Sequence, residues 1–214
     1  MISYFNILIF ISIGITISLI SNRLLLRFSQ SLGIRNKNDV TIRWSNQSKP
    51  SLGGIGLFLG FLSAMILYLI IEPEFNLFGN LEFLGLFFAS SLAFFMGLAD
   101  DAYDTKPLFK LFIQISCGLF LLFTGTNITL FHHEILDGVI TVIWVIILMN
   151  SLNMLDNMDG ITATTVLFAL LSCLVSGMLI GNQNQLYWMY ILIAVIGSIL
   201  GFLKYNINPS KMFM

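Results

Sequence analysis

The sequence predicts an all-α fold, a polytopic membrane helix bundle of about seven transmembrane helices, and two observations support that prediction. First, 57% of the 214 residues are hydrophobic and only 10% are charged, whereas an average soluble domain is about 25% charged. Second, the apolar residues form long runs, and the basic residues occupy alternate loops between these runs. The formal net charge of −1, with no basic stripe, also argues against a nucleic-acid partner.

Seven runs approach the length of about 20 mainly apolar residues that a helix needs to cross a bilayer. The expected spans are Tyr4–Ile20, Gly53–Ile71, Phe83–Ala99, Leu108–Gly125, Val139–Met149, Ile161–Ile180 and Trp188–Leu203. The fifth run is short, and we expect its helix to begin earlier, near Ile135. The first run lacks a basic segment before it and a small-residue cleavage site after it, so we interpret it as a retained span and not as a signal peptide. We treat residues 1–214 as a single transmembrane domain.

The basic residues follow the first, third and seventh spans. They are Arg23, Arg27, Arg35, Lys37, Arg43, Lys49, Lys106, Lys110, Lys204 and Lys211. The positive-inside rule makes these loops cytoplasmic, which places the N-terminus outside and the C-terminus inside. Because no ionisable residue lies in the middle of a span, a transporter with an ion pathway at membrane depth is disfavoured. The polar residues gather instead at the predicted cytoplasmic ends of the helices.

One polar cluster follows the first span, and another follows the last span. Lys49-Pro50-Ser51-Leu52-Gly53-Gly54 combines a lysine that can hold a phosphate with glycines that permit close approach of a ligand. The glycines at positions 56 and 60 also form a G-x-x-x-G pattern, so helix packing is the alternative interpretation. The tail after the last span, residues 206–214, is by itself an amphipathic juxtamembrane segment.

The third span ends in Asp100, Asp101 and Asp104. Carboxylates are disfavoured at the negative C-terminal end of a helix dipole, which suggests that they serve something other than stability. Carboxylate oxygens are the usual protein ligands of Mg²⁺, which often joins them to substrate phosphates. A solvated acidic turn is the alternative interpretation of this cluster.

The fifth span ends in a series of amide and carboxylate residues that recur every three positions. The series is Asn150, Asn153, Asp156 and Asp159. On a helix each step of three residues drifts by about 60°, so neighbours in the series touch and present one polar rim. The alternative is an interfacial cap, since Asn and Asp cap helices well, and Asp159 is a candidate cap for the sixth span.

In their order along the chain, these clusters resemble the motifs of the polyprenyl-phosphate N-acetylhexosamine-1-phosphate transferases, glycosyltransferase family 4. Residues 49–54 resemble the P-x-x-G-G element of that family. Asp100, Asp101 and Asp104 resemble the D-D-x-x-D form of its undecaprenyl-phosphate N-acetylglucosamine-1-phosphate branch more than the phospho-N-acetylmuramoyl-pentapeptide branch. Residues 150–160 match N-x-x-N-x-x-D-G-x-D-G except that Asn157 replaces the first glycine, and residues 206–214 match N-x-x-P-A-K-x-F-M except that Ser210 replaces the alanine.

The resemblance implies transfer of N-acetylhexosamine-1-phosphate, with GlcNAc-1-phosphate as the expected group, from a UDP-sugar to undecaprenyl phosphate, with release of UMP. This would be the first membrane step of cell-envelope polysaccharide synthesis, with Mg²⁺ or Mn²⁺ as cofactor. It would take place in the bacterial inner (plasma) membrane, at a multi-pass protein whose active site faces the cytoplasm. A non-catalytic membrane protein or a transporter fragment is the alternative, and it would tolerate loss of the inner aspartates. The sequence leaves open whether the protein forms a homodimer.

The resemblance also implies roles for individual residues. The catalytic residues would be Asp100, Asp101, Asp156 and Asp159. The substrate-binding residues would be Lys49, Asn150, Asn153, Asp104 and Phe213. The metal ligands would be Asp101 and Asp100, while the main metal-ligand aspartate of the family lies beyond the position of Met214. We therefore expect the chain to be the N-terminal portion of a larger polytopic enzyme, truncated at its C-terminus, and to lack part of the site.

Overall fold

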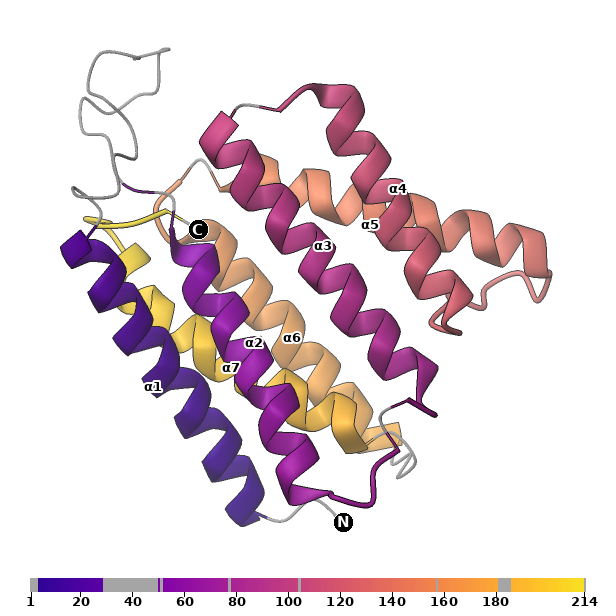
Figure 1. The fold of residues 1–214 in the computed structure, drawn as a ribbon, viewed down its shortest axis with the longest axis horizontal. Coiled ribbons are helices and arrows are strands. Elements are labelled where there is room, and N and C mark those ends of the chain that lie inside the picture. The colour runs from indigo at the N-terminus through magenta and orange to yellow at the C-terminus, as the bar shows by residue number, and fades with distance from the viewer. Residues whose placement is uncertain are drawn as a thin grey trace. The chain divides into compact units, whose positions relative to one another are not determined.

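The structure is a computed structural model, which describes residues 4–28, 50, 52–76, 78–103, 105–156, 158–180 and 186–213. Lys49 and Asp104, two of the predicted site residues, lie outside the described residues. The described part contains seven helices and confirms the all-α prediction (Figure 1). They are α1 (Tyr4–Phe28), α2 (Gly53–Ile71), α3 (Leu81–Tyr103), α4 (Pro107–Phe123), α5 (Glu134–Leu155), α6 (Ile161–Ile180) and α7 (Leu186–Asn206).

Six helices in the described part of the chain are long and apolar enough to cross a membrane, and α4, with 17 residues, is shorter. The chain is thus a multi-pass membrane protein, with six candidate spans where the sequence predicts about seven. The predicted bounds of the second and sixth spans coincide with α2 and α6. The other helices differ from the predicted runs mainly by extending into polar residues, as α5 does at its C-terminal end, while its start at Glu134 confirms the predicted start near Ile135. Which end of each helix faces the cytoplasm stays a prediction.

The chain divides into two compact units, which we describe separately. Unit 1 comprises Met1–Pro73 and Met158–Met214 and contains α1, α2, α6 and α7. Unit 2 comprises Glu74–Asn157 and contains α3, α4 and α5. The expectation of a single transmembrane domain stays a prediction.

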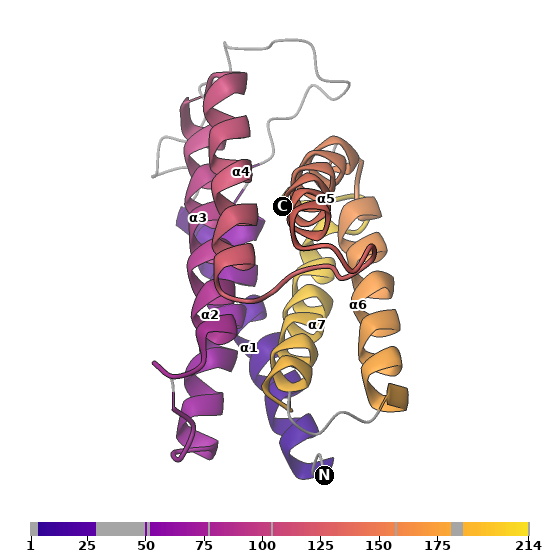
Figure 2. The same cartoon turned by 90° about the vertical axis from the view of Figure 1, so that its right-hand side faces the viewer.

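In unit 1, α7 packs against α1, α2 and α6, and α1 also packs against α2 (Figure 1). Helices α6 and α7 lie side by side in the turned view (Figure 2). Small residues bring α1 and α7 close together, because a Cβ on Gly14 would lie 2.9 Å from the backbone nitrogen of Ser198. The hydroxyl of Tyr205 donates to the carbonyl of Leu19 over 3.2 Å, so α1 and α7 run parallel. This close approach through small residues is typical of membrane helices.

Helix α2 runs antiparallel to these two helices. At one end, a Cβ on Gly56 would lie 2.7 Å from Oδ1 of Asn22. At the other end, the rings of Tyr68 and Tyr190 lie 6.0 Å apart. The contact at Gly56, together with one between Gly60 and Ser198, supports the helix-packing interpretation of the G-x-x-x-G pattern.

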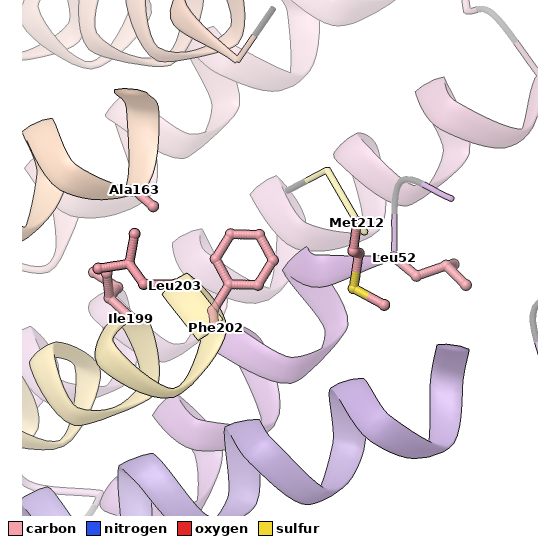
Figure 3. Close-up of a cluster of buried hydrophobic side chains, with 6 residues drawn as sticks. All are labelled: Leu52, Ala163, Ile199, Phe202, Leu203 and Met212. Carbon is pink, nitrogen blue, oxygen red and sulfur yellow. The ribbon is translucent and has the colours of Figure 1, made fainter. Parts of the chain in front are cut away.

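A cluster of buried apolar side chains joins the starts of α2 and α6 to the end of α7 and the tail that follows it (Figure 3). Its members are Leu52, Ala163, Ile199, Phe202, Leu203 and Met212. Because this cluster includes residues from the segments before α2 and after α7, it holds two of the predicted motif segments in place.

In unit 2, α4 packs against both α3 and α5. A Cβ on Gly118 would lie 2.9 Å from Cα of Val142, so α4 and α5 approach closely at that level. Gly138, near the start of α5, lies against Leu122 near the end of α4, which makes the two helices antiparallel. The start of α4 and the end of α5 therefore lie at the same end of unit 2, and α3 ends there as well.

Candidate active site

The tail after α7 folds back onto the start of α2. The backbone N–H of Phe213 donates to the carbonyl of Pro50 over 3.1 Å, and the N–H of Gly53 donates to the carbonyl of Phe213 over 3.0 Å. A side chain on Gly53 would lie 2.7 Å from that Phe213 oxygen, so only a glycine permits this approach. The structure thereby brings the P-x-x-G-G segment and the predicted substrate-binding residue Phe213 together.

Asn206, the last residue of α7, connects the tail to the loop before α6. Its side chain is 2% exposed. Oδ1 accepts a hydrogen bond from the N–H of Gly160 over 3.1 Å, and Nδ2 donates to the carbonyl of Met212 over 2.9 Å. Gly160 has a φ of +74°, a left-handed conformation that glycine adopts without steric cost. A single buried amide thus fixes two segments that are far apart in sequence.

Asp159, predicted to be catalytic, binds the tail as well. Its Oδ1 accepts from the hydroxyl of Ser210 over 2.6 Å, and its Oδ2 accepts from the N–H of Ser210 over 3.1 Å. The carboxylate is half-buried. Unit 1 therefore gathers Asp159, Asn206 and Phe213 at one end, while capping of α6 by Asp159 stays a prediction.

Unit 2 holds Asp100 by three contacts to one oxygen. Oδ1 of Asp100 lies 2.6 Å from Nζ of Lys110, and it accepts hydrogen bonds from Thr105 Oγ1 over 2.8 Å and from Thr105 N–H over 3.1 Å. The two charged side chains are partly exposed, with Lys110 at 30% and Asp100 at 22%. The next residue, Asp101, is exposed. The predicted acidic cluster at the end of α3 thus has a lysine beside it.

Asn150 forms a reciprocal amide pair with Gln114 of α4. Gln114 Nε2 donates to Asn150 Oδ1 over 3.1 Å, and Asn150 Nδ2 donates to Gln114 Oε1 over 3.0 Å. Further along the series, Asn153 is exposed and Asp156, which follows the end of α5, is half-buried. All three predicted residues lie at the end of unit 2 that carries Asp100.

Several partners in these contacts were not predicted from the sequence. They are Thr105, Lys110, Gln114, Asn206 and Ser210. A polar residue within an apolar run is the signal that could have found Gln114, and membership of a matched motif could have found Asn206. His132 and His133, the two histidines of the sequence, are both exposed in the loop before α5.

Two of the described residues are candidate ligands of a divalent cation. Asp100 and Asp101 are adjacent carboxylates, and Mg²⁺ is commonly bound by one or two carboxylates together with substrate phosphates. Within the part of the chain that the structure describes, no three His, Cys, Asp or Glu side chains come together as metal ligands. The chemistry of these two carboxylates fits a cation shared with a substrate phosphate, and their role as its ligands stays a prediction.

The fold and these clusters define a multi-pass membrane protein that presents carboxylates, amides and a lysine at the ends of its helices. Residues 83–214 match the sequence model of Glycosyl transferase family 4, and this match covers more than half of the chain. The chain belongs to that family. The family predicted from the four polar clusters is confirmed.

Individual relatives come from both branches of the family. A probable undecaprenyl-phosphate N-acetylglucosaminyl 1-phosphate transferase of Bacillus subtilis is 24% identical over 77% of this chain and 46% of its own length. A phospho-N-acetylmuramoyl-pentapeptide-transferase of Streptococcus agalactiae is 27% identical over 85% of this chain and 59% of its own length. The corresponding Streptococcus mutans protein is 26% identical over 94% and 65%. The chain thus spans about half to two thirds of the length of these curated relatives.

Proposed function

We propose that the protein containing this chain transfers N-acetylhexosamine-1-phosphate from a UDP-sugar to undecaprenyl phosphate and releases UMP. Family membership over residues 83–214 supports the proposal most strongly, because that region contains three of the four polar clusters. The transfer forms a phosphoanhydride bond between the lipid phosphate and the phosphate that carries the sugar. It breaks the bond between that phosphate and UMP.

The charge arrangement of the site suits this chemistry. Phosphoryl transfer depends mainly on positioning and on neutralising the charge of the phosphate oxygens. A phosphate monoester has a second pKa of about 6, so the lipid phosphate is already largely deprotonated at neutral pH. Asp100 therefore orients the acceptor and does not need to remove a proton, and Lys110 beside it supplies a positive charge 2.6 Å from the carboxylate.

Four further residues of the predicted site complete the proposal. Asn153 and Asp156 contact the nucleotide, Asp159 shapes the site through its bonds to Ser210, and Phe213 stacks on the uracil. Lys49 and Asp104 are included in the proposal as substrate-binding residues because of their positions in the matched sequence motifs. We propose Mg²⁺, or Mn²⁺, as the cofactor, held by Asp100 and Asp101, which would supply Lewis-acid neutralisation of the phosphates. We place the site on the cytoplasmic face of the bacterial inner membrane, since the basic loops gather at that side.

The sugar is proposed as GlcNAc, giving GlcNAc-1-phosphate as the transferred group. The D-D-x-x-D form of the second cluster and the Bacillus subtilis relative both favour it. The runner-up is the muramoyl-pentapeptide donor that the streptococcal relatives are named for. Supplying UDP-GlcNAc and UDP-MurNAc-pentapeptide in parallel to the same membranes distinguishes the two.

The test measures UMP release by the full-length protein in membranes supplied with undecaprenyl phosphate, a UDP-sugar and Mg²⁺. We expect Asp101→Asn and Asp156→Asn each to lower turnover by about 100-fold or more, as removal of a group that stabilises transition-state charge does. We expect chelation of divalent cations to abolish turnover. Glu74→Gln is the matched control, because Glu74 is exposed in the turn between α2 and α3. Near-normal turnover in both aspartate variants would favour a non-catalytic membrane protein or a transporter fragment.

A further inference from the structure

We propose that Gln114 and Asn150 form an amide lock that sets the register of α4 against α5, so that both act as positioning residues and Asn150 does not itself contact the substrate. This inference rests on the proposed function, because it concerns how that site is assembled. It departs from the sequence-based expectation that Asn150 binds substrate.

The first step is the number of hydrogen bonds that the Asn150 amide already makes. Nδ2 has two hydrogens, and they go to Oε1 of Gln114 and to the carbonyl of Ile146, both over 3.0 Å. Oδ1 accepts from Nε2 of Gln114 over 3.1 Å. Since both donor positions of the amide are used within the protein, a substrate would have to displace an existing bond in order to accept one from Asn150.

The second step is the position of Gln114. It is only 7% exposed, and it lies in a 17-residue helix whose other residues are almost all apolar. A buried amide without a partner is costly, and the reciprocal pair satisfies Gln114 through both its carbonyl and its NH₂ group. The two bonds form only when α4 and α5 have the correct relative height, since each amide must face the other directly.

The third step is what the lock holds. Lys110, which binds Asp100, lies one turn before Gln114 on the same face of α4. Asn153 lies about one turn after Asn150 on α5, toward the same end of the antiparallel pair. A shift between the two helices would therefore separate the Asp100–Lys110 ion pair from the Asn153 and Asp156 groups. The lock lies about one turn along α4 from Lys110 and about one turn along α5 from Asn153.

The activity test exchanges the two amides in the full-length protein. Gln114→Asn alone is one methylene too short, and Asn150→Gln alone is one methylene too long, so we expect each to lower turnover per folded molecule about five- to twentyfold. The double exchange restores the combined length, and we expect it to recover at least half of the wild-type turnover. If Asn150 contacted the substrate, the double variant would remain as impaired as Asn150→Gln. That result would overturn the proposal.

A cross-linking test needs no activity. In a Cys117→Ala, Cys173→Ala background, the pair Gln114→Cys with Asn150→Cys is treated in membranes with a bis-methanethiosulfonate of two-carbon spacer. We expect efficient cross-linking of this pair and little for Ser116→Cys with Asn150→Cys, because position 116 is turned about 200° around α4. Equal yields from the two pairs would overturn the lock. If the wild type transfers no sugar phosphate from any UDP-sugar, the proposed function fails, and the cross-link alone decides the lock.

Discussion

The adjacent glycines at the start of α2 allow a matched test of the contact between the tail and this helix. A Cβ on Gly53 would lie 2.7 Å from the carbonyl oxygen of Phe213 and 2.7 Å from Cζ of Phe202, whereas ordinary contacts begin at 3.4 Å. A Cβ on Gly54 would meet nothing within 4 Å. Gly53→Ala therefore forces the backbone at Phe213 to move, and Gly54→Ala does not.

The expected effects on stability have opposite signs. Overpacking costs about 1–3 kcal/mol, and losing the Gly53 N–H to Phe213 bond costs about 1 kcal/mol more, so Gly53→Ala should destabilise unit 1 by about 2–4 kcal/mol. Gly54→Ala should stabilise it by about 0.5–1 kcal/mol, because alanine is the better helix former. The melting temperature of Gly53→Ala should therefore lie below that of Gly54→Ala by several degrees, because a loss of stability lowers the melting temperature.

The wild type and the two variants are purified as full-length proteins in detergent and heated. The fraction of each protein that remains folded at each temperature is measured by size-exclusion chromatography. UMP release at a temperature where both variants are folded is measured in parallel. We expect turnover to fall in Gly53→Ala alone, since that change displaces Phe213. Equal melting temperatures for the two variants would refute the close backbone contact, and so would a melting temperature of Gly53→Ala at or above that of the wild type.

Three further predictions follow from contacts elsewhere in the chain. Lys110→Met should lower UMP release about tenfold or more by removing the cation beside Asp100. The melting temperature should stay nearly unchanged, because partly exposed ion pairs contribute only about 0–1 kcal/mol to stability. A fall in both UMP release and melting temperature would contradict this prediction. Gly14→Leu should reduce the folded yield on size-exclusion chromatography, whereas Gly97→Leu should not, since a Cβ on Gly14 meets the backbone of α7 and one on Gly97 meets nothing within 4 Å. Asp137→Ala should speed hydrogen exchange in the loop before α5, because its carboxylate accepts three backbone N–H bonds there; unchanged exchange would argue against that role.

The helices of this protein could be predicted well from the sequence because the bilayer imposes the rule. Inside the membrane, backbone groups must bond within the segment, so an apolar run of sufficient length becomes a helix. The runs at α2 and α6 give the observed bounds for this reason. The run at α5 underestimates its helix, which continues through polar residues to Leu155, because the backbone bonds of a helix do not stop where apolar side chains do.

The partners of the polar side chains could not be predicted in the same way. Gln114 and Asn150 are 36 positions apart in sequence, Gly160 and Asn206 are 46 apart, and Asp159 and Ser210 are 51 apart. Local periodicity specifies which face a residue takes on its own helix, and it carries no information about the neighbouring helix at that height. Motif order could indicate that such residues belong to a site, while their pairing depends on how the helices pack.

The low polar content of the chain makes hydrogen bonds to its buried polar side chains, such as Gln114, the features most sensitive to single substitutions. When one partner of a buried hydrogen bond is removed, the other is left unsatisfied, whereas replacing both partners by apolar groups can be nearly neutral. For Gln114 and Asn150 this asymmetry predicts that the double Leu variant keeps a higher folded yield than Asn150→Leu alone, in which the 7% exposed Gln114 would lose its partner.

The same double variant should have low turnover if the lock is required to align Asp100 with Asn153. Folded yield from size-exclusion chromatography and UMP release, measured on the same membranes, separate the two effects. A double variant that folds worse than the single would show that the amide pair contributes net stability beyond satisfying its own members.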